Sequence, residues 1–383
     1  MARFQYGGQA LIEGVLMRGR NALAVALRHP DGSIVFATDR LDLGLRARRA
    51  LRLPFLRGLV VLWDTLVTGT RWLVRSATLQ AAALLAEEKA GAGGPPIAGS
   101  LLKGLLLMPL GILRADPPPS SYTDPDAVGP AAPGSPAEEG LGKGYGVAIG
   151  GMLLLSLLFG VGIFFLLPLF LAQITVGRVN QGFPFQLTEG LIRVVIFVAY
   201  LMLSALSSDV RRTFQYHGAE HMSIHTLEAG EPLTVEKAHG HPTAHPRCGT
   251  EFLVVVLIVS ILAFALIGKQ PLLLMIGSRV ILIPVIAAVS YEVLQLGARQ
   301  RRHAIVRWLW SPGIWVQRIT TRQPSDDMLE VAITSLEKAL LADGNEIPQG
   351  STIFEARPLR PDELVEPAPA PKAEASGKAE AAE

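Results

Sequence analysis

Long apolar runs separated by short polar segments dominate the middle of the chain. Residues 144–172 form one uncharged apolar run, and residues 188–208 and 250–268 form two more. A fourth run covers residues 271–294. A helix of about 20 apolar residues crosses the hydrocarbon core of a bilayer, so each run is long enough to span a membrane. The pattern therefore predicts a mainly α-helical, polytopic membrane protein with about four transmembrane helices.

Two of these runs contain an arginine, and the depth of each arginine in the bilayer depends on where its transmembrane helix begins. Arg193 lies near the outer end of the second run. If the fourth helix begins near Val280, Arg279 reaches the outer interface with its long side chain at little cost. If the helix begins at Pro271, the same charge lies well inside the bilayer, which costs roughly 2.5–3.5 kcal/mol. We favour the first placement.

The N-terminal part predicts a β-module followed by helices at the membrane surface. Residues 1–53 contain two β-prone stretches separated by the turn sequence HPDG, which predicts a β-hairpin module. Residues 54–113 are expected to form amphipathic or interfacial helices. The first has a polar stripe between residues 54 and 86 and is expected to lie on an anionic membrane surface or to pack on the spans. The run at 97–113 is close to the minimum length of a span and contains a lysine and a proline, which favours an interfacial or re-entrant segment.

Composition divides the rest of the chain. A Pro-, Gly- and Ser-rich linker and a low-complexity tail are expected to be disordered. After the last span, arginines interleave with tryptophans, as in interfacial anchors, and an amphipathic helix suited to packing or oligomer contacts follows. In chain order the parts are a disordered linker at 114–143, a first transmembrane helix pair at 144–208, a cytoplasmic His/Cys-rich loop at 209–249, a second transmembrane helix pair at 250–298, an interfacial anchor with a C-terminal amphipathic helix at 299–350, and a disordered tail at 351–383.

Composition agrees with a membrane protein and argues against nucleic acid as a partner. The chain is 50% hydrophobic and 18% charged with a mean hydropathy of +0.36, values that are high for a soluble domain. A formal net charge of +2 provides no basic field for nucleic acid. The N-terminus lacks the pattern of a cleavable signal peptide, so the first long apolar segment is expected to direct insertion. Membrane lipids are the expected partners, with self-association or an unidentified membrane protein as further candidates.

The distribution of arginines orients the spans. The loops at 173–187 and 269–270 carry one basic residue each, whereas two arginines begin the loop at 209–249 and several follow the last span. The positive-inside rule therefore predicts that both termini and the 209–249 loop are cytoplasmic, in agreement with an even number of spans. If residues 97–113 also span, the count becomes odd and the termini lie on opposite sides.

Histidine is concentrated in the 209–249 loop. Six of the 8 histidines lie between positions 217 and 245, and the single cysteine, Cys248, follows. His217, His221 and His225 are spaced by four, which places them on one face of a helix. Together with Glu220, the first two form H-x-x-E-H, the inverted zinc-protease motif. In that chemistry the histidines bind Zn²⁺ and the glutamate takes a proton from the metal-bound water, which makes Glu220 the catalytic candidate.

Two ligand sets remain open for this metal. The sequence HPRCG offers His245 and Cys248 at a spacing close to that of zinc knuckles, and together with His217 and His221 they would form a closed, structural site. An open site would combine the two motif histidines with one carboxylate and keep a position for water. The carboxylate candidates are Glu228, Glu251 and Glu292. Of these, Glu292 lies in an apolar run near the cytoplasmic end of the last span, where a carboxylate needs a partner.

Other polar residues near the motif have simpler expected roles. His225 is expected to support the ligands, and His239 and His241 to lie on the loop surface. Glu292 has an equally good alternative as the salt-bridge partner of an arginine. Arg247, between the two ligand candidates, would bind an anionic substrate group or a lipid phosphate. The alternative to any metal site is a solvated loop whose histidines form local hydrogen bonds.

The N-terminal stretch YGGQALIEGVLMRG sets Glu13 and Arg18 among apolar residues. Its glycines permit close approach of another part of the backbone. The segment is expected either to fold against the histidine loop and complete the cytoplasmic site, or to be a strand with a surface glutamate. The strand is the simpler of the two interpretations.

Three separate stretches stand out together: GGQALIEGVLMRG near the start, YHGAEH with HPRCGT in the middle, and SYE at the end of the last apolar run. They resemble the YqhQ-like family of bacterial membrane proteins, domain of unknown function 1385, over about residues 4–345 without the linker. The resemblance implies a bacterial cell membrane and a metal-dependent enzyme, a description given to the family as a prediction without an assigned reaction. It also implies signature positions at His217, Glu220, His221, His245, Arg247, Cys248 and Glu292.

The sequence thus predicts a multi-pass protein of the bacterial inner membrane with a cytoplasmic divalent-metal site, for which zinc is the favoured ion. One hypothesis is a metal-dependent hydrolase with Glu220 as the general base. The other is a non-enzymatic scaffold, regulator or transport accessory whose metal is a structural clasp. The distant third-ligand glutamate of inverted zinc peptidases has no obvious equivalent, which argues against peptidase activity. The metal-ligand candidates are His217, His221, His245, Cys248 and Glu292.

Overall fold

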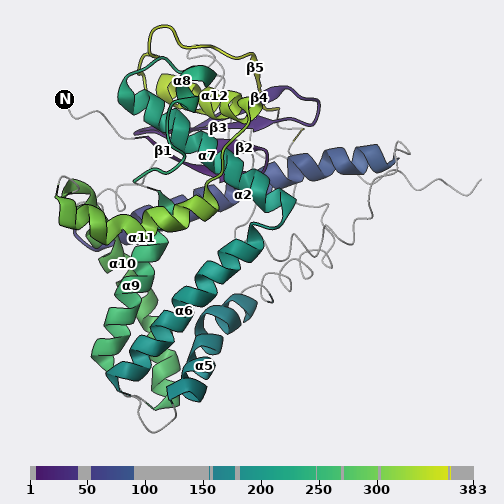
Figure 1. Cartoon of the computed structure of the whole chain (residues 1–383). Coiled ribbons are helices and arrows are strands. Elements are labelled where there is room, and N and C mark those ends of the chain that lie inside the picture. Colours follow the sequence, from purple (N-terminus) through teal and green to yellow (C-terminus); the bar gives the residue numbers. More distant parts are fainter. Residues whose placement is uncertain are drawn as a thin grey trace, which may run out of the picture.

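The protein consists of a layered α/β unit seated on one end of a bundle of long helices (Figure 1). The computed structural model describes residues 6–41, 53–89, 155, 158–176, 182–246, 248–268, 271–300, 303–360 and 363. The predicted linker at 114–143, the run at 97–113 and the end of the tail lie outside these residues. The chain is mainly helical, as predicted, and its N-terminal part forms a β-sheet.

Four N-terminal strands form an antiparallel meander, and a C-terminal strand joins its edge. In chain order the strands are β1 (Gly7–Leu11), β2 (Gly14–Arg18), β3 (Ala22–Arg28), β4 (Ile34–Arg40) and β5 (Ala356–Pro358). The sequence HPDG joins β3 to β4 as predicted, and its Gly32 has a φ of 87°, which glycine adopts without a Cβ clash. The predicted hairpin is one part of a five-stranded sheet in the order β1-β2-β3-β4-β5.

Strand β5 changes the predicted boundary of the C-terminal tail. Residues 351–383 are predicted to be disordered from their composition, but part of this segment pairs in parallel with β4. Leu359 N then donates a hydrogen bond to Phe36 O at 2.8 Å, and the Leu359 side chain is buried. The outer edge of β4 presents backbone groups that a short strand can pair with, even though that strand has no pattern of its own. The ordered part of the chain therefore extends beyond residue 351.

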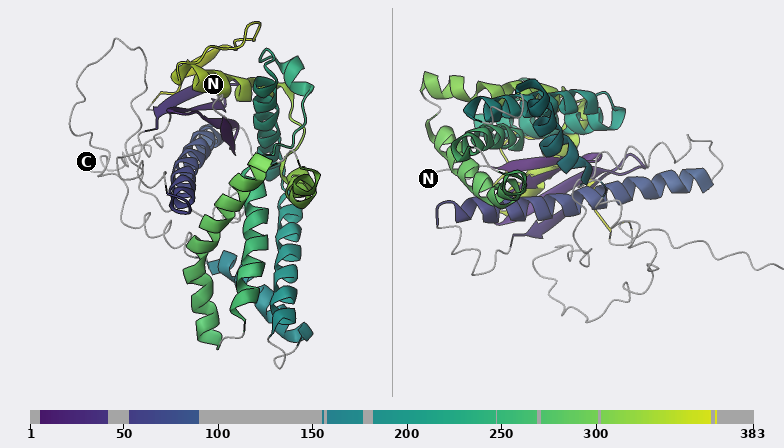
Figure 2. Two further views of the ribbon diagram at one scale, coloured as in Figure 1. Left: turned by 90° about the vertical axis from the view of Figure 1, so that its left-hand side faces the viewer. Right: turned by 90° about the horizontal axis from the view of Figure 1, so that it is seen from below.

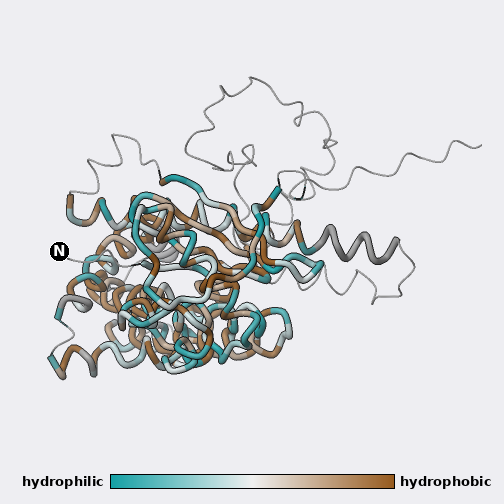
Figure 3. The backbone as a smooth tube through the Cα atoms, turned by 90° about the horizontal axis from the view of Figure 1, so that it is seen from above, coloured by the Kyte–Doolittle hydropathy of each residue, from teal (hydrophilic) through white to brown (hydrophobic). Residues whose placement is uncertain are grey.

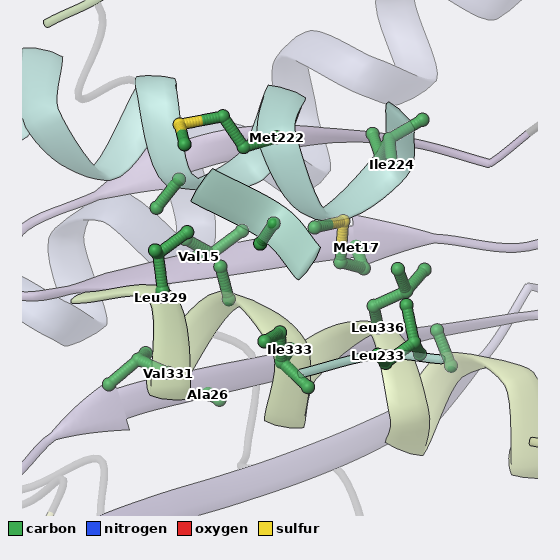
Figure 4. Close-up of a cluster of buried hydrophobic side chains, with 14 of the residues drawn as sticks. Val15, Met17, Ala26, Met222, Ile224, Leu233, Leu329, Val331, Ile333 and Leu336 are labelled. Carbon is green, nitrogen blue, oxygen red and sulfur yellow. The ribbon is translucent and has the colours of Figure 1, made fainter. Parts of the chain in front are cut away.

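Helices cover both faces of the sheet. They are α2 (Leu56–Lys89), α7 (Ser208–Ala229) and α12 (Asp326–Ala342). Side chains alternate along β2, so Val15 and Met17 enter a core with α7 and α12, whereas Leu16 packs on the side of α2 around Trp72. Figure 4 shows the first of these cores. Because both faces are buried, β2 and β3 are apolar at nearly every position rather than at alternate ones.

Three helices in the described part of the chain are long and apolar enough to cross a membrane. They cover Leu158–Val176, Phe183–Ser204 and Gly249–Ile267; the first contains the π-turn η1 (Gly162–Leu166) and α5 (Leu167–Val176), and the others are α6 and α9. The helix α10 (Leu272–Gln300) packs beside α9, and its described apolar stretch is shorter. The structure supports a membrane protein with three candidate spans, and the predicted count of about four is not confirmed.

Helices α2 and α11 (Ala304–Thr320) lie across the end of the bundle that faces the sheet (Figure 2). The polar stripe of α2 is paired within the protein: Arg57 binds Glu292 of α10, and Asp64 binds Arg18 of β2. Helix α2 therefore packs on α10, in agreement with one of its two expected placements. Seen from the sheet end, hydrophilic segments gather in the loops and turns around the hydrophobic elements (Figure 3). A short helix, α8 (Val235–His239), follows α7.

Truncation of Leu336 on α12 should destabilise the protein strongly. Leu336 is 0% exposed in the core under the sheet, so Leu336→Ala removes buried apolar atoms and leaves a cavity. We expect the free energy of unfolding to fall by about 2–5 kcal/mol, measured by chemical denaturation of the full chain in detergent micelles. Leu341→Ala on the same helix is the matched control, because Leu341 is 50% exposed. Equal losses for the two variants would contradict this assignment of the core.

Candidate metal centre

Helix α7 carries the histidine motif beside the face that packs on the sheet. Ala219 and Met222 are buried in the core, and the spacing of four turns His217, His221 and His225 toward the loop that follows the helix. Helix α7 is separate from α6, since Ser207 is in an extended conformation between them. The helix ends at a glycine in the left-handed conformation, which is the usual way for the chain to leave a helix.

A first cluster consists of His217, His221 and Cys248, whose candidate ligand atoms lie within 4.8 Å of one another. His217 Nδ1 donates to Thr320 O at 2.9 Å, and His221 Nδ1 donates to Thr243 O at 2.6 Å. A carbonyl oxygen only accepts hydrogen bonds, so each Nδ1 carries the proton and each Nε2 has the lone pair. His217 Nε2 lies 3.2 Å from Cys248 Sγ. This orientation by outer hydrogen bonds is typical of metal-binding histidines.

Cys248 reaches this cluster because it is the N-cap of α9. Its Sγ accepts a hydrogen bond from Thr250 N at 3.4 Å, so it faces the unpaired N–H groups at the start of the helix. The partial positive charge of a helix N-terminus favours an anionic group at this position. The only cysteine of the chain is thus held at the junction between the α/β unit and a candidate span.

The residue types of the first cluster fit a divalent metal of the zinc type. Imidazole nitrogens and thiolates are common ligands of Zn²⁺. The cluster has three such ligands, the number of protein ligands in catalytic zinc sites, which are built from two cysteines and one histidine or from histidines with or without a carboxylate. Burial lowers the pKa of His221, so its imidazole is neutral and its lone pair is available. Of the four side chains in the predicted closed site, the described structure groups three and leaves His245 outside.

A second cluster consists of His225, Glu228 and His245, whose candidate ligand atoms also lie within 4.8 Å of one another. His245 Nε2 is 3.5 Å from Glu228 Oε2, and the rings of His225 and His245 have centroids 4.6 Å apart. His225 Nε2 donates to Ala244 O at 3.0 Å. Burial lowers the pKa of His225 to about 4, so it is neutral at pH 7. His245 therefore lies with Glu228 rather than with Cys248.

Hydrogen bonds to the backbone of His245 hold its side chain beside Glu228. Gln317 of α11 accepts a hydrogen bond from His245 N at 2.9 Å and donates one to His245 O at 3.0 Å. Both residues are buried, with Gln317 at 0% exposure. Since the backbone is held from a helix far along the chain, the two-residue gap in HPRC does not by itself bring His245 and Cys248 to one ion.

Glu220, the predicted general base, is buried between α7 and β1 and is only 4% exposed. Burial raises the pKa of its carboxyl, and the nearby His217 and His245 partly oppose this. The N–H of Gly8 donates to the carboxyl, and a Cβ on Gly8 would lie 3.0 Å from Glu220 Cδ. Glycine at this position of β1 therefore lets the carboxyl approach the strand. Glu220 interacts with one histidine of each cluster.

The remaining candidates lie in other environments. Glu292 binds Arg57 Nε at 2.8 Å and Phe55 N at 3.0 Å, so its alternative role as a salt-bridge partner is the one seen. Glu251 is buried against Gly313 of α11. Neither carboxylate joins a cluster within the described ranges. His239 pairs with Asp326 at 2.7 Å and His241 with Glu231 at 3.5 Å, and Arg247 lies outside the described residues.

The N-terminal stretch packs against the histidine helix. Glu13, at the β1–β2 turn with a φ of 56°, binds Arg212 Nη2 at 2.6 Å and accepts a hydrogen bond from Tyr216 OH at 3.2 Å. Glu13 is therefore more than a surface glutamate on a strand. Glu13 contacts α7 just before the motif, and Gly8 contacts Glu220 within it, so the first hairpin packs along this part of the helix.

Sequence reasoning missed the groups that orient the ligands. Two of them are main-chain carbonyls, of Thr243 and Thr320, and every residue has a carbonyl, so no residue type signals them. Gln317 had a usable signal, because helical spacing puts it on the face of α11 opposite Trp308 and Trp315. A polar side chain on the buried face of an interfacial helix needs a partner.

Replacement of Gln317 should loosen the loop that carries His245. Gln317→Ala leaves the buried N–H and C=O of His245 without partners, so we expect the free energy of unfolding to fall by about 1–3 kcal/mol. Proteolytic cleavage between residues 240 and 248 should become faster in the same variant. Gln323→Ala is the control, since the side chain of Gln323 bonds the exposed ring of His239, and its backbone oxygen, which accepts from Gln215, is kept in the variant. If the loop in Gln317→Ala is as resistant to the protease as that of the control, Gln317 does not hold the backbone of His245 in place.

Comparison with known proteins identifies the family. The family model described as "Protein of unknown function (DUF1385)" matches residues 53–342. "Uncharacterized protein YqhQ" of Bacillus subtilis (strain 168) is 30% identical over 352 residues, which are 91% of this chain and 97% of the Bacillus protein. No solved structure matches the chain. The residues matched by the family model include α7 with its histidines and the candidate spans, and the chain belongs to the DUF1385, or YqhQ-like, family.

Proposed function

We propose that this protein is a metal-dependent hydrolase of the inner membrane, with a zinc-type cation held by His217, His221 and Cys248. The observation that carries the proposal is the orientation of the two imidazoles. Thr320 O and Thr243 O hold both Nδ1 protons, which leaves both Nε2 lone pairs for the cluster that contains Cys248 Sγ. Gly218 supports this geometry, because a Cβ there would collide with Arg322 O and displace the segment that carries Thr320.

The chain supplies an acid–base group next to these ligands. A bound Zn²⁺ lowers the pKa of its water to about 7 and so provides hydroxide at neutral pH. Glu220 is one residue from His221, and its raised pKa moves the carboxyl toward the range in which a general base can both accept and release a proton. Gly8 N–H holds this carboxyl in place. The roles are therefore ligands for the two motif histidines and Cys248, and proton transfer for Glu220.

A structural clasp is the second candidate, and one observation favours it. His221 is 1% exposed and Cys248 5% exposed, so a cation there would be nearly enclosed. It would connect α7 to the first residue of α9, as structural metal sites do between elements. A clasp requires no free position for substrate and no role for Glu220.

The proposal also places the protein in the bilayer. Helix α10 is the fourth span, since it packs along α9 and is 29 residues long. Helices α2 and α11 lie in the headgroup region, with Trp63, Trp308 and Trp315 exposed by 67%, 75% and 70% toward it. The α/β unit and the candidate centre are on the cytoplasmic side, so substrates come from the cytoplasm or the inner leaflet.

Elemental analysis of purified protein tests the first ligand set. His221→Ala and Cys248→Ser should each lose one bound zinc per chain relative to wild type, whereas Glu220→Gln should retain it. His303→Ala is the matched control, because His303 is exposed and caps α11 outside both clusters. Equal metal content in all five proteins would refute the site.

Glu220→Gln separates the hydrolase from the clasp. If Glu220 transfers a proton, this variant should keep its metal and lose about 10²–10⁴-fold in rate, the usual contribution of a general base. The assay uses chromogenic esters, phosphodiesters and amides in mixed micelles with the full chain. Metal-loaded wild type without activity, or with activity equal to that of Glu220→Gln, would favour the clasp and contradict the hydrolase.

Labelling of introduced cysteines tests the orientation. In a Cys248→Ser background, Phe183→Cys at the far end of α6 should react with an impermeant maleimide applied to intact spheroplasts. Glu236→Cys on α8 should react only after permeabilisation, because α8 belongs to the cytoplasmic unit. The background variant should not react, and the reverse pattern would invert the proposed topology.

A further inference from the structure

The second cluster on α7 has no part in the function proposed above, although its side chains are typical metal ligands. His225 and Glu228 lie on successive turns of the helix after His221, and His245 faces them from the loop. Two imidazoles and a carboxylate form a ligand set that suits first-row divalent cations. The sequence offered Glu228 as a carboxylate for an open site, but in combination with other histidines.

The distances in this cluster suit an ion better than a direct contact. Hydrogen bonds between nitrogen and oxygen are usually about 2.7–3.2 Å long, so the 3.5 Å between His245 Nε2 and Glu228 Oε2 makes a weak bond at best. His225 donates its Nε2 proton to Ala244 O, which leaves the lone pair of Nδ1 available. The cluster thus places ring nitrogens of His225 and His245 and a carboxylate oxygen of Glu228 within 4.8 Å of one another.

The ligands are also held before any ion binds. His225 is fixed by the carbonyl of Ala244, and the backbone of His245 is held on both sides by Gln317. The side chain of His245 is only 4% exposed, whereas that of Glu228 is 36% exposed. Two ordered histidines thus form the wall of a site that solvent reaches past the carboxylate.

The two clusters adjoin each other. The ring centroids of His217 and His221 are 4.5 Å apart, those of His221 and His245 are 5.6 Å apart, and those of His245 and His225 are 4.6 Å apart. We propose that His225, Glu228 and His245 form a second divalent-cation site, so that the protein carries a two-cation centre along α7. Its nitrogen and oxygen ligands accept Fe²⁺, Mn²⁺ or Zn²⁺, whereas the thiolate of the first site selects softer zinc-type ions. The second site rests on its own residues and does not depend on hydrolytic activity.

Cobalt titration distinguishes the two sites, because Co²⁺ replaces zinc-type ions and its absorption reports its ligands. A thiolate bound to Co²⁺ produces a charge-transfer band in the near ultraviolet, and a site of nitrogen and oxygen ligands does not. Full-length protein in detergent is stripped with a chelator and titrated. We expect wild type to bind two equivalents, only one of which contributes the charge-transfer band.

Two variants show which cluster binds each equivalent of Co²⁺. Glu228→Gln should bind one equivalent with the charge-transfer band intact, and Cys248→Ser should bind one equivalent without it. Glu231→Gln is the control for Glu228→Gln, because Glu231 is a similarly exposed carboxylate three residues away that pairs with His241. Glu228 lies at the open side of the cluster, so its conservative replacement should not affect folding.

The titration can refute the second cation site without refuting the first, and the first without the second. A wild type that binds one equivalent with the charge-transfer band, or a Glu228→Gln variant that still binds two, overturns the second site and leaves the first. One equivalent without the band supports the second site and overturns the first. Absence of binding in the wild type overturns both.

Discussion

Helix α7 packs one face on the hydrophobic core and presents the adjoining face to a polar loop, and both faces have to be satisfied for the centre to form. On the core side, Ala219 and Met222 are fully buried with β2 and α12. Buried imidazoles lose their hydration, which costs free energy unless their polar atoms have partners. The carbonyls of Thr243, Thr320 and Ala244 supply those partners and at the same time select which nitrogen keeps its lone pair.

The same burial that disfavours charge on the histidines favours a cation between them. Burial lowers the pKa of His221 and of His225, so proton binding does not compete with a metal at neutral pH. A row of imidazoles with a thiol at one end and a carboxylate at the other places several candidate ligand atoms in a confined volume. A metal ion satisfies several of them at once, whereas a single proton satisfies one. This is the physical basis for both proposed sites.

Much of the fold, and half of the centre, follows from the sequence. Apolar runs predicted helices where α6 and α9 lie, HPDG predicted the β3–β4 turn, and the spacing of four predicted that His217 and His221 share a face. The grouping of His245 was not predictable from HPRC, because Gln317 determines its backbone from about 70 residues away. Likewise, Arg57 pairs with Glu292 through tertiary packing. Local patterns report local structure, and these contacts depend on how distant elements meet.

The position of the clusters relates the two proposed roles to each other. The first includes Cys248, the N-cap of a candidate span, and its His221 is 1% exposed, so an ion there would connect the α/β unit to the bundle. The second is bordered by Glu228, whose side chain is 36% exposed, so a substrate has easier access to it. Glu220 interacts with one histidine of each. If both clusters hold cations, Glu220, the proposed proton-transfer group of the first, is within electrostatic reach of both.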